Sequence, residues 1–132
     1  MVTAVTAMAH EPTIVSFDPP GSTLTYGFAI NSAGVIAGAY LDTSDVYHAY
    51  LRAPDGSFTI FDAPGAGTGS HQGTAFYAIT AEGTLAGQYI DSNNVFHPFL
   101  REPIPSAITS GILLRDNYID ASNVIHGFVR TP

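Results

Sequence analysis

The sequence contains neither cysteine nor lysine, and its four basic residues, all arginine, stand against eleven acidic ones. The missing cysteine excludes disulfides, zinc–thiolate sites and thiol nucleophiles. The formal net charge of −7 at pH 7 argues against phosphate-bearing partners, because binding nucleic acid or an anionic membrane surface needs clustered Lys and Arg. No apolar run approaches the roughly 20 residues of a membrane-spanning helix. We therefore expect no nucleic acid partner and no membrane span.

A sustained hydrophobic period of 3.6 residues is also missing, so helix should be minimal. Charged residues make up only 11% of the 132 residues and hydrophobic ones 45%, which predicts one folded domain. Residues 1–12 are predicted to be an N-terminal tail. Its Ala7-Met8-Ala9 resembles the end of a secretory signal, although the basic start is absent. Export to the periplasm or the cell exterior is one prediction, and an undocked apolar tail is the alternative.

An internal repeat dominates the rest of the chain. "AINSAGVIAGAYLDTSDVYHAYLR" from Ala29 aligns without gaps with "AITAEGTLAGQYIDSNNVFHPFLR" from Ala78 and "AITSGILLRDNYIDASNVIHGFVR" from Ala107. Upstream, "FDPPG" at Phe17 matches "FDAPG" at Phe61. We predict a single repeat domain over residues 13–132, with units at about 13–53, 57–102 and 103–132.

Each unit is predicted to consist of short strands rich in β-branched and aromatic residues and separated by Pro, Gly, Asn and Asp. In the second unit these are Phe58–Phe61, Phe76–Thr80, Thr84–Ile90 and Val95–Arg101. Four strands in about 44 residues are typical of a β-propeller blade. The third unit lacks the "FDAPG" strand, so we expect an all-β chain of about eleven strands, or about three propeller-like blades with the third incomplete.

Two to three blades cannot close a ring, and an unclosed array leaves edge strands exposed. We therefore expect homo-oligomerisation, as a homodimer or a higher homo-oligomer, to complete the ring. A strand around Ile14–Phe17 is a candidate for the place missing from the third blade, in its own chain or in its partner.

These repeats resemble the bacterial HAF-type extracellular repeat. The shared pattern is "FDxPG...AIN..G.IAG.Y.D....HGFLR", and it covers nearly all of Ile14–Arg130. The resemblance implies a β-propeller-like fold and an exported protein, and it implies no particular activity. The third unit departs from the pattern, because Ile112 replaces the glycine of Gly34 and Gly83, and Asp116 replaces that of Gly38 and Gly87. Tight backbone positions at those glycines are therefore not expected in the third unit.

Each unit also repeats one set of polar and aromatic residues around a hairpin. The set comprises Asp42, Asp91 and Asp120, then Tyr40, Tyr89 and Tyr118, then His48, His97 and His126, and then Arg52, Arg101 and Arg130. Catalysis normally needs one asymmetric constellation, so the first interpretation is structural: each Asp caps its turn, each His donates to an Asp or a carbonyl, and each Arg closes the blade edge. The second interpretation is a calcium site, because the turns at the three aspartates are rich in the oxygen ligands that calcium prefers.

Function is expected where the copies differ. The second copy contains a longer Gly-rich loop, "APGAGTGSHQGTAFY", with Ser70 and His71 in it and Asp62 just before it. These residue types perform acyl transfer, but sequence neighbours should rarely point at each other, so His71 as a lone general base is geometrically easier. A flexible polar loop is the alternative. Tyr26 and Tyr77 are predicted to be core residues, with exposure for stacking on sugars as the other option.

Two functions compete. The first is a small calcium-assisted hydrolase of a lactone or similar ester, in which calcium polarises the carbonyl and a histidine activates water. Its catalytic candidates are Ser70, His71, His48, His97 and His126. Calcium-dependent lactonases on six-bladed propellers offer an analogy at the level of fold only. The second function is a noncatalytic module that binds glycans or surface partners through repeated aromatic pockets, and a purely structural surface repeat is the third possibility.

Overall fold

The computed structural model describes residues 11–103, 114–119 and 125–130, with side chains described for residues 11–103. All regular elements in this part of the chain are β-strands, and it contains no helix long and apolar enough to cross a membrane. The strands are β1 (Leu24–Ile30), β2 (Ile36–Leu41), β3 (Tyr47–Arg52), β4 (Phe58–Phe61), β5 (Gly73–Ile79), β6 (Leu85–Ile90), β7 (Phe96–Arg101), β8 (Leu114–Ile119) and β9 (Ile125–Arg130). The prediction of an all-β chain is confirmed for these residues.

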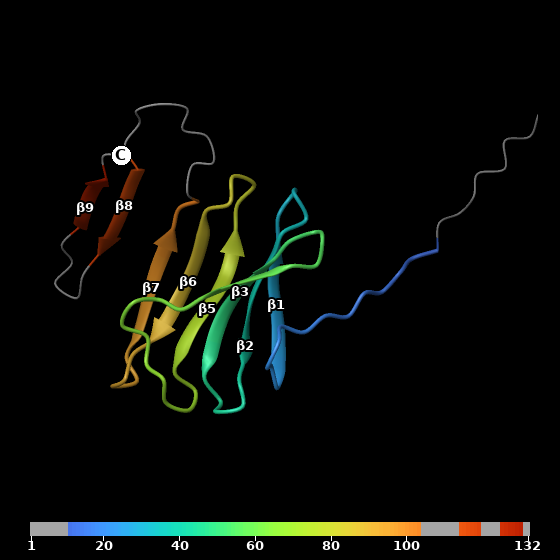
Figure 1. Cartoon of the computed structure of the whole chain (residues 1–132), viewed down its shortest axis with the longest axis horizontal. Coiled ribbons are helices and arrows are strands. Elements are labelled where there is room, and N and C mark those ends of the chain that lie inside the picture. The colour runs from blue at the N-terminus through green and yellow to red at the C-terminus, as the bar shows by residue number, and fades with distance from the viewer. Residues whose placement is uncertain (1–10, 104–113, 120–124, 131–132) are drawn as a thin grey trace, which may run out of the picture.

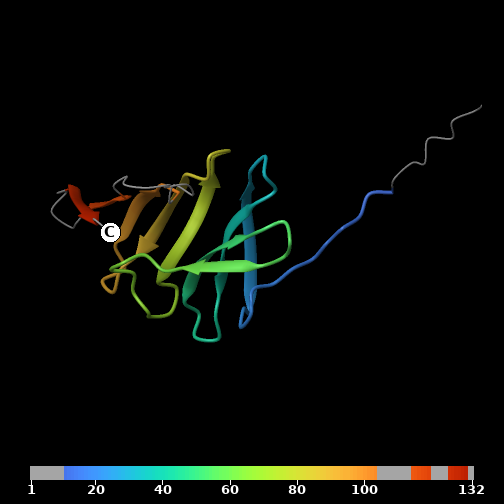
Figure 2. The ribbon, with the colours of Figure 1, turned by 45° about the horizontal axis from the view of Figure 1, so that its top comes forward.

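Six strands follow the path β1-β2-β3-β5-β6-β7 through a sheet that curls into an open half-barrel (Figures 1 and 2). This sheet contains two antiparallel meanders, the first meander of β1–β3 and the second meander of β5–β7. One parallel bridge between Tyr47 and Gly73 joins them. β4 pairs with β3 off this path, and β8 with β9 forms a separate antiparallel hairpin.

The repeat in the sequence is also a repeat in the structure. The strands of the second meander begin and end 49 residues after those of the first, and β8 and β9 lie 29 residues after β6 and β7. The register of both meanders shifts at the same repeat position, at Phe28 in β1 and at Tyr77 in β5. Such a shift is a β-bulge, in which one extra residue bends the strand and redirects a side chain.

The hydrophobic core lies between the two meanders. Ala37 and Ala49 of the first meander are 0% exposed and lie in one cluster with Phe76 and Leu85 of the second, which are 0% and 1% exposed. The partly buried side chains around this cluster are Leu51, Phe61, Ile79 and Phe99. Small alanines on one face let the large side chains of the other approach closely, so the two faces are complementary.

The strand predicted at Ile14–Phe17 is not formed, and nine strands rather than eleven lie in the described residues. Ile14 is 94% exposed and Val15 is 65% exposed. The sequence of this segment resembles that of β4, but β4 pairs with the edge of β3, whereas Ile14–Phe17 pairs with no strand in the described part. A strand needs a partner as well as a suitable sequence, because unpaired N–H and C=O groups gain nothing from the extended form.

Candidate functional sites

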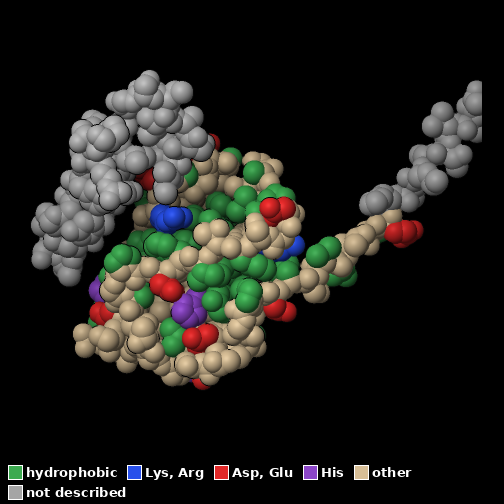
Figure 3. All heavy atoms as spheres, in the orientation of Figure 1, with side chains coloured by type: hydrophobic (Ala, Val, Ile, Leu, Met, Phe, Trp, Pro, Cys, Tyr) green, Lys and Arg blue, Asp and Glu red, His purple; other side chains and the backbone are tan. Residues whose placement is uncertain are grey.

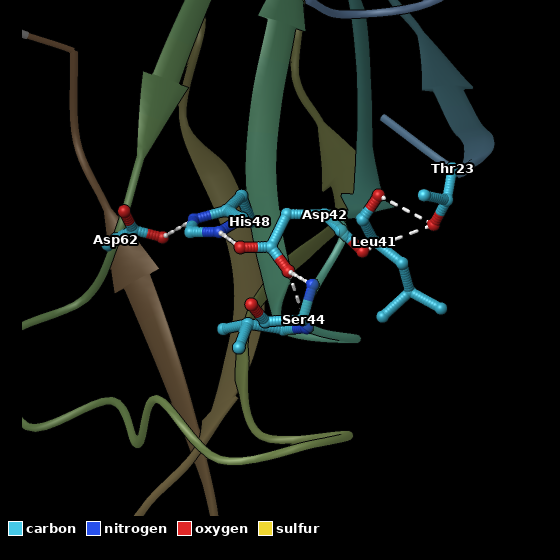
Figure 4. Close-up of polar contacts among 7 residues, drawn as sticks. Thr23, Leu41, Asp42, Ser44, His48 and Asp62 are labelled. Atoms are coloured by element: carbon cyan, nitrogen blue, oxygen red, sulfur yellow. Dashed lines mark hydrogen bonds and ion pairs between the residues drawn. The ribbon is translucent and has the colours of Figure 1, made fainter. Parts of the chain in front are cut away.

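His48 in β3 lies between two carboxylates (Figure 4). Its Nε2 is 3.3 Å from Oδ2 of Asp42, which follows β2, and its Nδ1 is 2.8 Å from Oδ1 of Asp62, which follows β4. The ring stacks on Tyr40 with a centroid distance of 5.2 Å. A neutral imidazole carries one N–H, so only the protonated ring can donate to both carboxylates.

His97 in β7 repeats half of this arrangement. Its Nε2 is 2.9 Å from Oδ2 of Asp91, and its ring stacks on Tyr89 at 4.7 Å. No second carboxylate contacts His97 within residues 11–103. In the third unit, Asp120 lies outside the described residues, as do the side chains of Tyr118, His126 and Arg130.

The second oxygen of each aspartate caps its own turn. In both turns Oδ1 accepts hydrogen bonds from the backbone N–H groups two and four residues further along the chain, at 2.7 and 3.0 Å for Asp42 and at 2.8 and 2.9 Å for Asp91. The backbone donors at Val46 and Ser44 hold the pKa of Asp42 below its usual value. The hydrogen bond from His97 does the same for the pKa of Asp91. This arrangement is what the structural interpretation of the repeated set expects.

Within residues 11–103, no group of three or more His, Asp or Glu side chains is placed to share a metal ion. Both oxygens of Asp42 and of Asp91 already accept hydrogen bonds or contact a histidine. Calcium at these turns would therefore compete with the hydrogen bonds that shape them. The calcium site at Asp42, Asp91 and Asp120 stays a prediction, and its third residue lies outside the described part.

The repeated arginines contact the phenylalanines of the "FD" motifs, which are the Phe-Asp pairs that begin "FDPPG" at Phe17 and "FDAPG" at Phe61. The guanidinium of Arg52 lies 4.7 Å from the ring centroid of Phe17, and that of Arg101 lies 4.9 Å from the ring centroid of Phe61. Both contacts have the geometry of a cation–π interaction. Each "FD" phenylalanine is therefore anchored to the meander that follows it in the chain.

Glycine is required beneath two aromatic rings. A Cβ on Gly38 would lie 2.9 Å from the Tyr50 ring and overlap the carbonyl of Tyr26, and a Cβ on Gly87 would lie 2.8 Å from the Phe99 ring. The tight positions expected at these glycines are thus present in both meanders. In the β8–β9 hairpin, the corresponding pair in the register is Asp116 with Phe128.

Ser70 and His71 do point at each other, contrary to expectation. The Ser70 hydroxyl lies 2.8 Å from Nδ1 of His71. His71 has a φ of +63°, a left-handed conformation uncommon outside glycine, and its N–H donates to the carbonyl of Asp45 at 2.6 Å. Sequence reasoning missed the contact because this φ turns the histidine back toward the preceding residue.

The other catalytic candidates do not join this pair. Asp62, which precedes the loop in the sequence, is bonded to His48 instead. Among residues 11–103, no carboxylate, His48 or His97 is hydrogen-bonded to Ser70 or His71. Nearby, Gln72 orders the loop, because its side-chain oxygen accepts from the Gly69 N–H at 2.9 Å and its amide donates to Asn94 at 2.9 Å.

A groove lined by aromatic rings lies across both meanders and beside this loop. It encloses about 330 Å³, and its lining includes Tyr26, Phe28, Tyr47, His71, Tyr77 and Phe96. Tyr26, Phe28 and Tyr77 are 36%, 45% and 44% exposed, so the prediction that Tyr26 and Tyr77 are core residues is wrong. Tyr26 and Phe28 stack with ring planes 7° apart, and the Phe28 and Tyr77 centroids are 5.1 Å apart.

The two bulges explain the exposure of Phe28 and Tyr77. Phe28 and Tyr77 are the extra residues of β1 and β5, so their side chains do not follow the alternation between the two sheet faces. The two rings contact each other at the junction of the two meanders. Partial burial raises the pKa of Tyr77 above its ordinary value of 10.0, further from neutral pH, and its hydroxyl is protonated there. Among residues 11–103, no Asp, Glu or Arg side chain lines the groove. The site therefore offers aromatic faces and neutral hydrogen-bonding groups.

The chain was compared with models of known protein families, with curated proteins and with solved structures, and none of the three comparisons found a match. The function must therefore be argued from these sites.

Proposed function

We propose that each meander is a propeller-like blade of an exported HAF-type repeat and that homo-oligomerisation completes the ring. Three observations support this proposal: the 49-residue recurrence of the strands, the complementary alanine and phenylalanine faces, and the place of β4 as a fourth strand beside β3. Large apolar side chains are also exposed, including Leu100 at 75% and Phe96 at 60%. Hydrophobic side chains reach the surface on the face shown in Figure 3. Association would cover such surface.

We propose further that the protein is a noncatalytic module that binds neutral glycans in the aromatic groove. The observation that carries this proposal is the set of three exposed rings, Tyr26, Phe28 and Tyr77, in contact over the junction of the meanders. The apolar faces of sugar rings stack on aromatic side chains, and tyrosine hydroxyls at the rim can bond sugar hydroxyls. A net charge of −7 and a groove lining without charged side chains favour uncharged sugars over acidic ones.

Calorimetric titration with neutral β-linked hexasaccharides of glucose, xylose and N-acetylglucosamine tests the binding proposal. We expect one of these to bind, polygalacturonate not to bind, and Tyr77→Ala to weaken binding by about fivefold, because stacking contributes on the order of 1 kcal/mol. Ile60→Ala is the matched control, since Ile60 is 41% exposed and does not line the groove. Unchanged binding in Tyr77→Ala, or no binding of any neutral sugar, would contradict the proposal.

The second candidate function is the calcium-assisted hydrolase of a lactone or similar ester. One observation favours it: the Ser70–His71 contact of 2.8 Å lies at the groove, whose apolar lining could hold the substrate. In this proposal Nδ1 of His71 removes the hydroxyl proton of Ser70 as the oxygen attacks the carbonyl, the ester C–O bond breaks and His71 returns the proton to the leaving alcohol oxygen, and water then cleaves the acyl-serine. In the other route His71 takes a proton from water, which attacks the carbonyl, and gives it to the leaving alcohol oxygen. Calcium, if bound, would polarise that carbonyl.

Turnover of a small lactone and ester panel, measured in calcium and in excess chelator, tests this candidate. His71→Gln should lower the rate at least about 100-fold by either route, the usual contribution of a positioned acid–base group, and Ser70→Ala should do so if Ser70 is the nucleophile. Thr59→Ala in β4, an exposed residue outside the groove lining and outside the aspartate turns, is the control and should leave the rate unchanged. Turnover that survives the chelator would eliminate the role of calcium, and its absence from the wild-type protein would eliminate the hydrolase.

A further inference from the structure

The second "FD" motif connects the two meanders. Phe61 stacks on Phe76 of the second meander with centroids 5.5 Å apart, and the next residue, Asp62, lies 2.8 Å from Nδ1 of His48 in the first. The phenylalanine therefore packs on the meander that follows the motif, and the aspartate bonds to the meander that precedes it.

The first "FD" motif makes only half of these contacts. Phe17 packs against Tyr50 and under Arg52, as its repeat position requires. Asp18 is exposed, and its carboxylate accepts one hydrogen bond, from the Thr25 hydroxyl at 2.7 Å. No histidine contacts Asp18 within residues 11–103. Asp18, which corresponds to Asp62 in the repeat, therefore has no histidine partner among residues 11–103.

His97, in turn, has no second aspartate partner among the described residues. Its Nε2 contacts Asp91, but no described residue contacts its Nδ1, which in His48 faces Asp62. The chain continues from β7 into the third unit without an "FD" motif, so the sequence supplies no counterpart of Asp62 after Arg101. Within the described residues, His97 and Asp18 are therefore the two unpaired halves of the contact that His48 and Asp62 make.

The strands that carry His48 and His97 differ in the same way, because β7 has one neighbouring strand fewer than β3 in the described part. β3 pairs with β2 on one edge and with β4 on the other, whereas β7 pairs only with β6 in the described part. The segment Ile14–Phe17, which corresponds to β4 in the repeat, pairs with no described strand. Phe17 holds this segment at Arg52 of the first meander, while β7 is the far end of the strand path, so the two cannot meet within one copy.

We propose that Ile14–Phe17 of a second copy adds to the outer edge of β7 as its fourth strand, and that Asp18 of the second copy bonds to Nδ1 of His97. This inference rests on the homo-oligomerisation proposed above and names its interface. Strand addition to an open edge is a common recognition mode, in which backbone hydrogen bonds give affinity and side chains give specificity. Successive copies would associate head to tail, a geometry that forms rings when it closes.

Pro98 modulates this interface. It occupies the position of Ala49, which pairs with Phe61 of β4. At the hairpin end, the backbone N–H of Asp91 donates to the carbonyl of Val95, so these two residues form a hydrogen-bonded pair. Hydrogen-bonded and non-hydrogen-bonded pairs alternate along an antiparallel ladder, so Pro98 lies in a non-hydrogen-bonded pair and its nitrogen faces the outer edge of β7. Proline has no N–H, so the added strand makes one hydrogen bond fewer than β4 makes. The intermolecular contact should be weaker than the intramolecular one.

Cross-linking of cysteine variants tests the interface, because the wild-type chain has no cysteine. Asp18→Cys and His97→Cys chains are treated with a bis-maleimide separately and as a mixture. We expect a cross-linked dimer in the mixture only, because a head-to-tail contact joins unlike positions. A chain with both His48→Cys and Asp62→Cys is the control for reach and should cross-link internally, while Glu82→Cys mixed with His97→Cys should yield no dimer.

Light scattering on the wild-type protein separates the possible failures. In one outcome, the solution mass exceeds that of the monomer and the internal control reacts, while the mixture yields no cross-link. That result would overturn this interface and leave homo-oligomerisation standing. A monomeric mass would overturn both. Pro98→Ala retains both partners and adds one N–H, so it should tighten association about fivefold. Association that is unchanged or weakened in Pro98→Ala would contradict strand addition at this edge.

Discussion

Each hairpin aspartate holds two parts of the structure at once. One oxygen of Asp42 caps the turn after β2, and the other contacts His48, which also reaches Asp62 after β4. The side chain of a single residue thereby links a local turn to the fourth strand. The sequence predicted the cap and the histidine contact as one structural option, because the same residues recur in every unit.

Stability should depend on acidity through these aspartates. The pKa of Asp42 is lower in the folded chain than its ordinary value of 3.8, so its stabilising effect is complete above that value and is lost as the pH falls through the lower folded value. Urea unfolding at pH 6 and pH 3 should therefore show a smaller loss of stability in Asp42→Asn than in the wild type. Asp45→Asn, in the same turn, is the control, and an identical pH dependence in wild type and Asp42→Asn would contradict the assignment.

The Ser70–His71 contact could not be predicted at the residue scale. It depends on the positive φ of His71 and on the bond from its N–H to Asp45, a residue 26 positions earlier in the chain. Backbone conformations of this kind are set by tertiary contacts rather than by the residue itself.

At the scale of elements, hydrophobic and aromatic content identified the strands. β4 has the predicted bounds, and β6 and β7 each begin one residue later than predicted. The two bulges were not predictable, because a bulge is defined by the pairing partner and not by the strand's own sequence. Missing the bulge in β5 led to the wrong placement of Tyr77 in the core. The failure at Ile14–Phe17 has a similar cause, since that segment has a strand sequence and no neighbouring strand.

The two meanders should unfold together if their shared core stabilises both. Phe76→Ala removes a fully buried ring between them and should lower the free energy of unfolding by about 3–5 kcal/mol. Phe96→Ala removes a ring that is 60% exposed, so its cost should be below about 1 kcal/mol. Urea denaturation of both variants measures this difference. Equal losses would mean that the core does not lie between the meanders.

At the scale of the whole molecule, the repeat predicted an all-β chain, and the described residues confirm it. The single curled sheet was not predictable, because the two meanders, which the sequence presents as separate units, are joined by one parallel bridge between Tyr47 and Gly73. The groove was missed for the same reason. Its walls come from residues far apart in the chain, and the junction of the meanders brings them together.

If the aromatic groove binds glycans as proposed above, the paired bulges at Phe28 and Tyr77 have a consequence for polymeric ligands. The first and second meanders each carry this bulge, so a first meander joined to a second one in this way places two bulged aromatic side chains at their junction, whereas the third unit has Ser106 at that position. An array of such junctions would present binding sites at a fixed spacing. A short sugar could occupy one junction, whereas a polysaccharide could occupy several and gain avidity of about 10²–10⁴ without any new contact. Such a surface would discriminate ligands by chain length more sharply than by sugar type.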